Sequence, residues 1–104
     1  MSLLIDKVYK ESEKLWIVSL QGEVDIDNAS ELKEVLMDIA KEGFDIKIDA
    51  SKLEYIDSTG LGILIGALKR LKEKQRDIYI SNPKNNVRKL FLITGLDKIF
   101  KLEG

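Results

Sequence analysis

The chain has 104 residues, which is the length of one ordinary domain. Its 17 basic and 18 acidic residues nearly cancel, so it lacks the basic excess that is typical of nucleic-acid-binding domains. The sequence contains no Cys and no His, which excludes disulfides, thiolate chemistry, Ser-His-Asp catalysis and His-based metal sites. No apolar run approaches the roughly 20 residues that span a bilayer, and no signal-peptide pattern opens the chain. We therefore expect one cytoplasmic domain over residues 1–104, not an enzyme, with no cofactor and no metal.

The first part of the chain predicts a β-hairpin. Residues 3–9 form one candidate strand and residues 14–21 another, and the polar stretch 10–13 between them is typical of a turn. The segment Gly22-Glu23-Val24-Asp25 is expected to end the second strand. We therefore expect the two strands to pair antiparallel.

A helix is predicted next, with sequence signals at both of its ends. Asn28 is the expected N-cap, and Glu31 three residues later completes a capping box. Gly43 is expected to close the helix at its C-terminal end. The apolar side chains between these signals recur at helical spacing and would form one buried face: Ala29, Leu32, Val35, Leu36, Ile39 and Ala40.

A strand and a second helix follow, joined by a turn rich in glycine and hydroxyl groups. Residues 45–50 alternate apolar and polar side chains like a half-buried strand, and residues 51–55 are expected to connect this strand to the turn. The helix is predicted from Leu61 to about Gln75. Basic residues gather in its last turns, where the helix dipole favours them. Its apolar face is predicted to consist of Leu61, Leu64, Ile65, Leu68 and Leu71.

The last part of the chain predicts a short strand over residues 77–81 and then a third helix. Asn82 is the expected N-cap of this helix, with Pro83 at the first helical position, and Gly95 is expected to stop it. Residues 96–102 have room for one final short strand. The inner face of the third helix is predicted to consist of Val87, Leu90, Phe91 and Thr94.

The order of these elements indicates an α/β fold. Strands that are separated by helices favour parallel pairing through right-handed crossovers, whereas the opening hairpin adds an antiparallel strand. We therefore expect a single domain in which a mixed β-sheet packs with about three helices.

The turn before the second helix has a structural interpretation that needs no special function. Either Asp57 or Ser58 would cap the helix, and such caps contribute about 0.5–2 kcal/mol and occur in most proteins. A nucleotide-phosphate loop is disfavoured, because Gly60, Gly62 and Gly66 have the spacing G-x-G-x-x-x-G, which matches neither the dinucleotide fingerprint nor the Walker motif.

A phosphorylation switch is another interpretation of the same turn. A phosphoryl group on Ser58 would lie near the N–H groups of residues 60–62, which we expect to form an anion site at the helix start. The group would add about −1.5 to −2 charges beside Asp57. The glycines at positions 60 and 62 would also let the backbone of a partner approach closely. Spacing alone does not favour this interpretation over a simple cap.

Three stretches of the sequence resemble the bacterial anti-sigma factor antagonists, the STAS-domain family. The hexapeptide Asp57-Ser58-Thr59-Gly60-Leu61-Gly62 resembles the family signature D-S-[ST]-G-L-G. Gly22-Glu23-Val24-Asp25 followed by Ala29 is similar to the G-E-[LV]-D…A segment after the second strand. Residues 87–91 and 94–100 are similar to the third helix and its exit. The three stretches occur in the family's order over nearly the whole chain, so the resemblance implies a STAS-like fold.

The resemblance implies a protein that binds an anti-sigma factor and thereby releases a sigma factor. In that family the anti-sigma factor is a serine kinase that uses ATP, and it phosphorylates the Ser that follows the Asp of the signature. The implied acceptor is Ser58, with Thr59 as the less favoured hydroxyl, and a PP2C-type phosphatase would remove the phosphate. Asp25 is expected near Ser58 on the kinase-facing surface. The implied partner-binding residues are Asp25, Asp57, Ser58, Thr59, Gly60, Leu61 and Gly62.

Two other functions stay open from the sequence. The same domain type serves as a scaffold or regulatory subunit in stress and transport complexes, where it would need no such kinase. Direct binding of a nucleotide or a lipid is the other alternative. The sequence differs from longer family members because it ends at Gly104, without their extra C-terminal helix, so the third helix is expected to be more exposed. We expect a monomer when free, with no direct contact to nucleic acid or to a membrane.

Overall fold

Strands and helices follow one another along the chain in nearly the predicted order. The computed structural model describes residues 2–104. A short 3-10 helix, η1, that the sequence did not predict lies between the third helix and the last strand. The elements in chain order are β1 (Leu3–Lys10), β2 (Leu15–Val24), α1 (Ala29–Ala40), β3 (Asp45–Ile56), α2 (Ser58–Lys72), β4 (Ile78–Ser81), α3 (Asn85–Thr94), η1 (Leu96–Lys98) and β5 (Lys101–Glu103).

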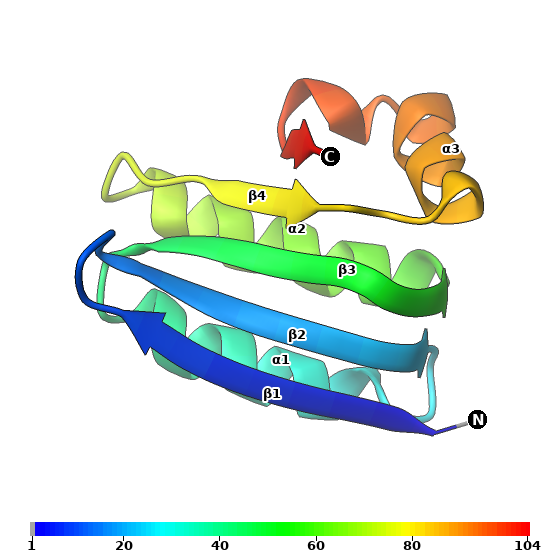
Figure 1. Cartoon of the computed structure of the whole chain (residues 1–104), viewed down its shortest axis with the longest axis horizontal. Helices are drawn as coiled ribbons and strands as arrows, with labels where there is room; N and C mark the ends of the chain where they lie inside the picture. The colour runs from blue at the N-terminus through cyan, green and yellow to red at the C-terminus, as the bar shows by residue number, and fades with distance from the viewer. Residues whose placement is uncertain (1) are drawn as a thin grey trace.

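A mixed sheet of five strands forms the centre of the molecule (Figure 1). The strands lie in the order β1-β2-β3-β4-β5, with β1 antiparallel to β2 and each later neighbouring pair parallel. Helices α1 and α2 lie next to each other behind one face of the sheet, and α3 lies beyond β4 on the side where the chain ends (Figure 1). This arrangement confirms the predicted α/β class and the opening hairpin.

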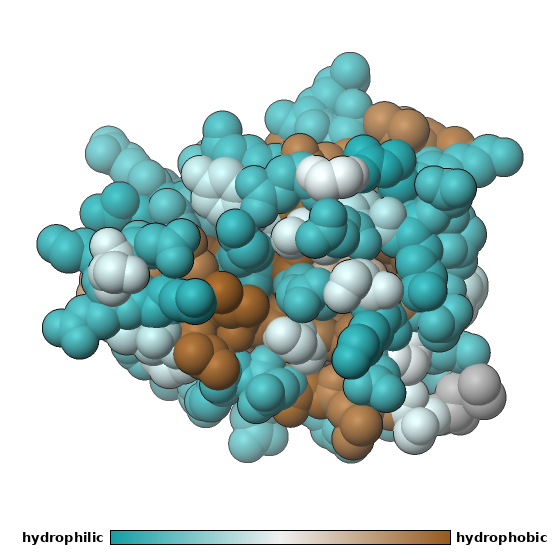
Figure 2. Space-filling view, viewed as in Figure 1, coloured by the Kyte–Doolittle hydropathy of each residue, from teal (hydrophilic) through white to brown (hydrophobic). Residues whose placement is uncertain are grey.

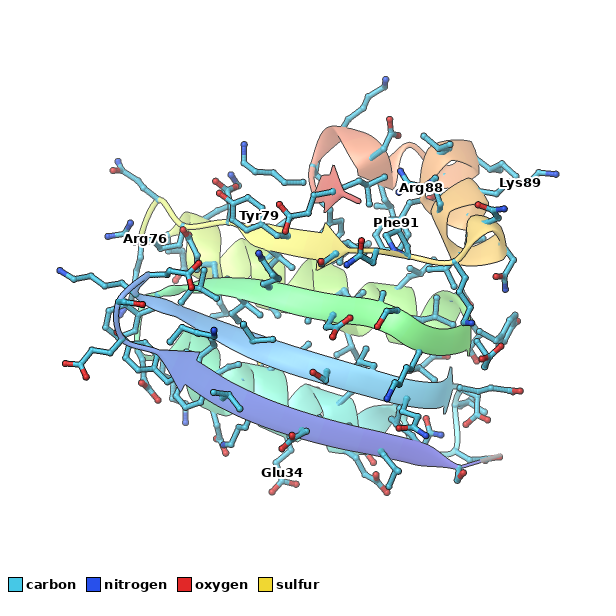
Figure 3. The ribbon with its side chains drawn as sticks, in the orientation of Figure 1. Glu34, Arg76, Tyr79, Arg88, Lys89 and Phe91 are labelled. Atoms are coloured by element: carbon cyan, nitrogen blue, oxygen red, sulfur yellow. The ribbon has the colours of Figure 1, made fainter. Side chains whose placement is uncertain are left out.

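The hydrophobic core fills the space between the sheet and helices α1 and α2. Val18 of β2 and Ile48 of β3 point into it and are buried, as is Leu64 of α2. Phe91 of α3, labelled in Figure 3, extends the core toward β5. Its ring meets that of Phe100 edge-on with the centroids 5.5 Å apart. Each fully buried side chain of this size stabilises the fold by about 1.5–3 kcal/mol, so the inner apolar faces determine where the helices lie.

The opposite face of the sheet is turned toward the viewer in Figures 1 and 2. Its surface is mostly hydrophilic with some hydrophobic patches (Figure 2), and Leu4 and Val8 of β1 are more than half exposed. An ion pair joins β3 to β5 across β4, with Lys47 Nζ 2.9 Å from Glu103 Oε1. The hydrogen bond that Lys47 Nζ donates to the Glu103 carboxylate holds the pKa of Lys47 above its ordinary value, although partial burial acts in the opposite direction.

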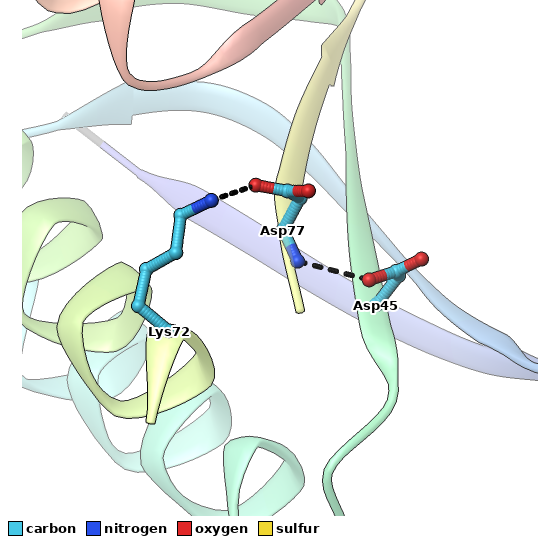
Figure 4. A network of polar contacts seen from close by, with 3 residues as sticks. All are labelled: Asp45, Lys72 and Asp77. Atoms are coloured by element: carbon cyan, nitrogen blue, oxygen red, sulfur yellow. Dashed lines mark hydrogen bonds and ion pairs between the residues drawn. The ribbon is translucent and has the colours of Figure 1, made fainter. Parts of the chain in front are cut away.

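Asp77 ties the start of β4 to two neighbouring elements (Figure 4). Its carboxylate forms an ion pair with Lys72 at the end of α2. Its backbone N–H donates to Asp45 Oδ1 at 2.9 Å, at the start of β3. The connection from α2 to β4 is therefore fixed at the end of the sheet where the parallel strands begin.

The predicted ends of β2 and β3 are wrong, because both strands continue further. Gly22 adopts a φ of +106°, a backbone conformation that residues with a Cβ rarely adopt, and it lies where the register between β2 and β3 shifts. The strand resumes after this irregularity, and Val24 pairs with Ile56. Residues 51–56 are therefore part of β3 and not a connection.

The predicted start of α3 is also wrong, and the helix predicted from Leu61 begins three residues earlier, directly after Asp57, one of its two predicted caps. Helix α2 already begins at Ser58 and ends at Lys72. Helix α3 begins at Asn85, after Asn82 and Pro83, because the backbone N–H of Asn82 donates to Glu103 O of β5 at 2.7 Å. Asn82 has a left-handed backbone with a φ of +53°, so the chain bends there, and Lys84, with an extended backbone, directly precedes the helix. Gly95 does end α3, as predicted, with a φ of +77°.

Candidate functional site

The candidate site lies where β2 and β3 end and the helices α1 and α2 begin, at the right-hand end of Figure 1. The two strands are parallel neighbours, and Val24 pairs with Ile56 near their ends. The N–H of Asp57 donates to Val24 O at 3.1 Å and extends this pairing by one bond. The residues that follow each strand, the loop 25–28 and the turn 57–62, are therefore held next to each other. We call these two segments the candidate site.

Asp57 caps α2 and places two hydroxyl groups at its start. Its backbone is extended, and its Oδ1 accepts a hydrogen bond from Gly60 N at 3.0 Å. Ser58 and Thr59 are the first two residues of the helix, and both are exposed. Their N–H groups precede the helical hydrogen-bond ladder, where the helix dipole favours negative charge. The Ser58 hydroxyl is thus presented to solvent at a position that can carry an anion.

The anion site predicted from the N–H groups of residues 60–62 is wrong. The Gly60 N–H is used by the Asp57 carboxylate, and the Leu61 N–H donates to Asp57 O at 3.0 Å. Gly62 lies within the helix, where its N–H belongs to the regular ladder. Since these donors are already occupied, a phosphate on Ser58 would depend on the earlier N–H groups of residues 58 and 59.

The glycines of the turn have two different surroundings. Gly60 is buried, and a Cβ there would lie 2.6 Å from Val24 Cγ1 and 2.7 Å from Ile56 Cγ1. Gly62 is exposed, and a Cβ there would have no atom within 4 Å. Gly60 thus lets α2 approach the strand ends, whereas Gly62 leaves an open surface beside Ser58. Among the predicted docking residues, Gly60 and Leu61 are buried and act from beneath that surface.

Asp25 and Asn28 hold the loop between β2 and α1 by side-chain hydrogen bonds, and we call this pair the loop clamp. Asp25 Oδ1 accepts from Asp27 N at 3.0 Å and from Asn28 N at 3.2 Å. Asn28 Oδ1 accepts from Asp25 N at 3.0 Å, and its Nδ2 donates to Glu23 O at 2.9 Å. Asn28 is 9% exposed, so the bonds of its side chain form where water competes little, whereas the bond from Asp27 N to Asp25 Oδ1 is exposed.

The loop clamp changes the roles predicted for its two residues. The capping box of Asn28 and Glu31 is wrong, because the Asn28 side chain turns back toward β2 and makes no cap hydrogen bond to α1. Asp25 lies in the loop beside the turn that carries Ser58, and its place on a kinase-facing surface stays a prediction. Its carboxylate oxygen Oδ1 is bonded within its own loop, so we assign Asp25 to fixing the loop as well as to the charge of the surface.

Ile26 is a residue of the candidate site that the sequence-based prediction missed. Its side chain is 74% exposed, between Asp25 and Asp27. Tyr55, close to the end of β3, is also exposed. A signal for Ile26 was present in the sequence, because a large apolar residue stands between two aspartates in a turn. That pattern is equally compatible with a side chain that is buried under the first turn of α1.

Further features of the described residues bear on metal binding, on hollows and on membrane crossing. Within residues 2–104, no three acidic side chains are grouped so that they could hold a metal ion. A hollow of about 630 Å³ is lined by Leu92, Ile99 and Phe100 together with charged side chains, and it lies at the other end of α2 from Ser58. In the part of the chain that the structure describes, no helix has the length and apolar character needed to cross a membrane.

Comparison with known proteins agrees with the fold. The STAS domain family model matches residues 6–104. An anti-sigma-B factor antagonist from Staphylococcus aureus is 38% identical over 85 residues, which cover 81% of this chain and 79% of that protein. These values establish the family relationship across most of both chains.

Two solved structures have the same fold. A crystal structure of a Thermotoga maritima protein gives a TM-score of 0.87 at 24% identity, covering 96% of this chain and 86% of that one. The Bacillus cell fate determinant SpoIIAA in its phosphorylated form gives a TM-score of 0.70 at 20% identity, covering 97% of this chain and 90% of that one. These structures show the same fold, and the match of the family model with the 38% identical relative shows that this chain belongs to the STAS domain family.

Proposed function

We propose that this protein is an anti-sigma factor antagonist, a regulatory binding protein and not an enzyme. It binds its anti-sigma factor through the candidate site and so releases the sigma factor. The kinship with the Staphylococcus aureus antagonist supports this proposal. The observation that carries it is the exposed Ser58 at the first position of α2, directly after the capping Asp57, in a chain with the family's turn sequence.

Phosphorylation of Ser58 is the proposed off switch. The anti-sigma factor acts as the serine kinase, with ATP as the phosphate donor, and a PP2C-type phosphatase resets the protein. The phosphate adds about −1.5 to −2 charges at an end of the molecule that already carries Asp25, Asp27 and Asp57. The same helix terminus tolerates negative charge well. The modification therefore changes the docking surface by charge and bulk while the fold stays intact.

The docking residues divide into those that contact the partner and those that support the contact. Ser58, Thr59 and Gly62 are exposed and face the partner, whereas the cap formed by Asp57 and the buried Gly60 shape the turn beneath them. Because the turn is fixed before binding, little conformational entropy is lost when the complex forms.

Replacing the acceptor hydroxyl tests the proposal. We expect Ser58→Ala to abolish phosphate incorporation by the cognate anti-sigma factor and ATP while the two proteins still bind. Ser58→Glu should weaken binding by tenfold or more, which corresponds to at least about 1.4 kcal/mol. Phosphosite mapping by mass spectrometry and titration calorimetry measure the two effects.

Thr59→Ala is the matched control, because it removes the neighbouring hydroxyl from the same helix start. This variant should still be phosphorylated to one group per chain. Full labelling of Ser58→Ala would show that Ser58 is not the acceptor, and wild-type protein that does not bind the anti-sigma factor would contradict the proposed function itself.

A further inference from the structure

Ile26 is a large apolar side chain that the fold leaves in water. At 74% it is slightly more exposed than Ile93 of α3, which is 71% exposed. Single exposed apolar side chains are common on protein surfaces, so exposure by itself indicates no function. The surroundings of Ile26 distinguish it from the other exposed apolar residues.

The loop that carries Ile26 is fixed on both sides of it. Asp25 bonds to the backbone N–H groups of the two residues that follow Ile26. Asn28 bonds to the backbone of Asp25 and of Glu23, and Ala29 N donates to Asp25 O at 2.8 Å. Ile26 is therefore held in an outward position by the loop clamp, and it can be buried by a partner with little loss of backbone entropy.

Ile26 also lies in register with the acceptor serine. Val24 and Ile56 are paired across β2 and β3, and Ile26 follows the first by two residues as Ser58 follows the second. The bond from Asp57 N to Val24 O keeps the two segments together beyond the sheet. A protein that covers Ser58 therefore reaches the loop of Ile26 as part of the same surface.

The charge around Ile26 indicates the chemistry of the partner surface. Its chain neighbours Asp25 and Asp27 are acidic, and Asp57 begins the adjacent turn. A surface that accepts this end of the molecule gains most if an apolar pocket is surrounded by cationic groups, because apolar anchors within a complementary charged rim are typical of tight interfaces.

From these observations we infer that Ile26 is the apolar anchor of the docking surface, and that it enters an apolar pocket with a cationic rim on the anti-sigma factor. The inference rests on the proposed function, since it identifies a contact residue of the same site. The family resemblance specifies residues 22–25 and 29 and leaves position 26 unspecified. The loop clamp positions Ile26, and the acidic neighbours orient the approach.

Affinity measurements with the purified cognate anti-sigma factor test the anchor. Ile26→Ser should weaken binding at least about tenfold, or about 1.4 kcal/mol, with an unchanged melting temperature because the side chain is exposed. Ile93→Ser is the matched control, since it removes the same side chain at a similar exposure on α3. It should bind as the wild type does. Equal affinities of Ile26→Ser and wild type would overturn the inference, and so would equal losses in both variants.

Salt dependence tests the cationic rim separately. The affinity of the wild type should fall as the salt concentration rises, and Asp27→Asn should make this dependence weaker. The loop clamp uses only the backbone N–H of Asp27, so its bonds are kept in this variant. A wild-type affinity that does not change with salt would overturn the inference that the pocket on the anti-sigma factor has a cationic rim. Wild-type protein that does not bind at all would overturn the proposed function, which is a different result from equal binding by Ile26→Ser.

Discussion

Gly60 and Gly62 stand two positions apart on α2, and the space around them differs completely. A Cβ on Gly60 would overlap with Val24 and Ile56, whereas a Cβ on Gly62 would have no atom within 4 Å. The motif D-S-[ST]-G-L-G therefore combines a packing requirement beneath the helix with an open surface above it. The sequence alone does not distinguish the two glycines. Their roles differ because the ends of the strands lie against Gly60 and not against Gly62.

Substitution by Ala separates these two glycines experimentally. We expect Gly60→Ala to lower the free energy of unfolding by about 1–3 kcal/mol, because the added methyl group overpacks the junction of α2 with the strand ends. Gly62→Ala should leave it unchanged or raise it by up to about 1 kcal/mol, since Ala favours a helix over Gly. Urea denaturation of both variants measures the difference. A Gly60→Ala protein as stable as Gly62→Ala would show that the contact with the strands is looser than the structure indicates.

At the scale of elements, the sequence predicts the helices better than the ends of the strands. Five of the six apolar positions predicted for the inner face of α1 are buried, whereas Val35 is only half-buried. The end of β3 was missed because its buried residues Leu53 and Ile56 lie three positions apart, which hides the alternation that marks a strand. Pairing with β2 makes this segment a strand, and a contact between distant parts of the chain cannot be read from local periodicity.

Asn28 shows a similar limit at the candidate site. Its amide had two possible roles, to cap α1 or to bond to the strand before it, and local sequence favours the cap. The fold places Glu23 O within 2.9 Å of Asn28 Nδ2, and the second role is realised. The acceptor turn, by contrast, was recognisable because Asp57 to Gly62 are contiguous in the sequence.

Removing the amide of Asn28 tests the loop clamp. In Asn28→Ala, the half-buried groups Asp25 N and Glu23 O lose their partner, and we expect the free energy of unfolding to fall by about 1–3 kcal/mol. Asn86→Ala is a suitable control, because Asn86 also donates to a backbone oxygen, Glu54 O at 2.8 Å, but on the exposed surface. Asn86→Ala should lower the free energy of unfolding by less than Asn28→Ala does. Equal losses in denaturation experiments would mean that burial of the loop clamp does not strengthen it.

On the scale of the whole molecule, the sheet is covered by α1 and α2 on one face, and the other face carries charged side chains. The pair of Lys47 and Glu103 on that face joins the third strand to the last one. Its side chains are 30% and 42% exposed, and pairs of this kind contribute roughly 0.2–1 kcal/mol. Its contribution depends on pH, because Glu103 raises the pKa of Lys47 above the ordinary value of 10.5.

The direction of this pH dependence follows from the raised pKa. The folded state holds the Lys47 proton more tightly than the unfolded state, so the pair stabilises fully below pH 10.5 and loses its effect as the pH rises through the raised pKa. We expect Glu103→Gln to be less stable than the wild type at pH 8, and the difference to shrink above pH 10.5. Urea denaturation of both proteins from pH 8 to above pH 10.5 measures this difference in stability.

Glu34→Gln provides the control for this experiment. Glu34 lies on the exposed side of α1 and points away from the molecule (Figure 3). The substitution removes one negative charge, as Glu103→Gln does, and leaves the pair of Lys47 and Glu103 intact. The difference in stability between Glu34→Gln and the wild type should therefore not shrink above pH 10.5. A constant difference between Glu103→Gln and the wild type up to pH 12 would contradict the assigned coupling to Lys47.

The order of the strands in the sheet has a consequence for synthesis on the ribosome. Each strand lies next to the one made just before it, so a growing chain adds every new strand to an edge that already exists. No strand has to be inserted between two others, and domains begin to fold while the chain is still being made. The loop of Ile26, the acceptor Ser58 and the whole of α2 precede β4 in the chain. The nascent chain thus has all the elements that present Ser58 before the ribosome has translated the last two strands.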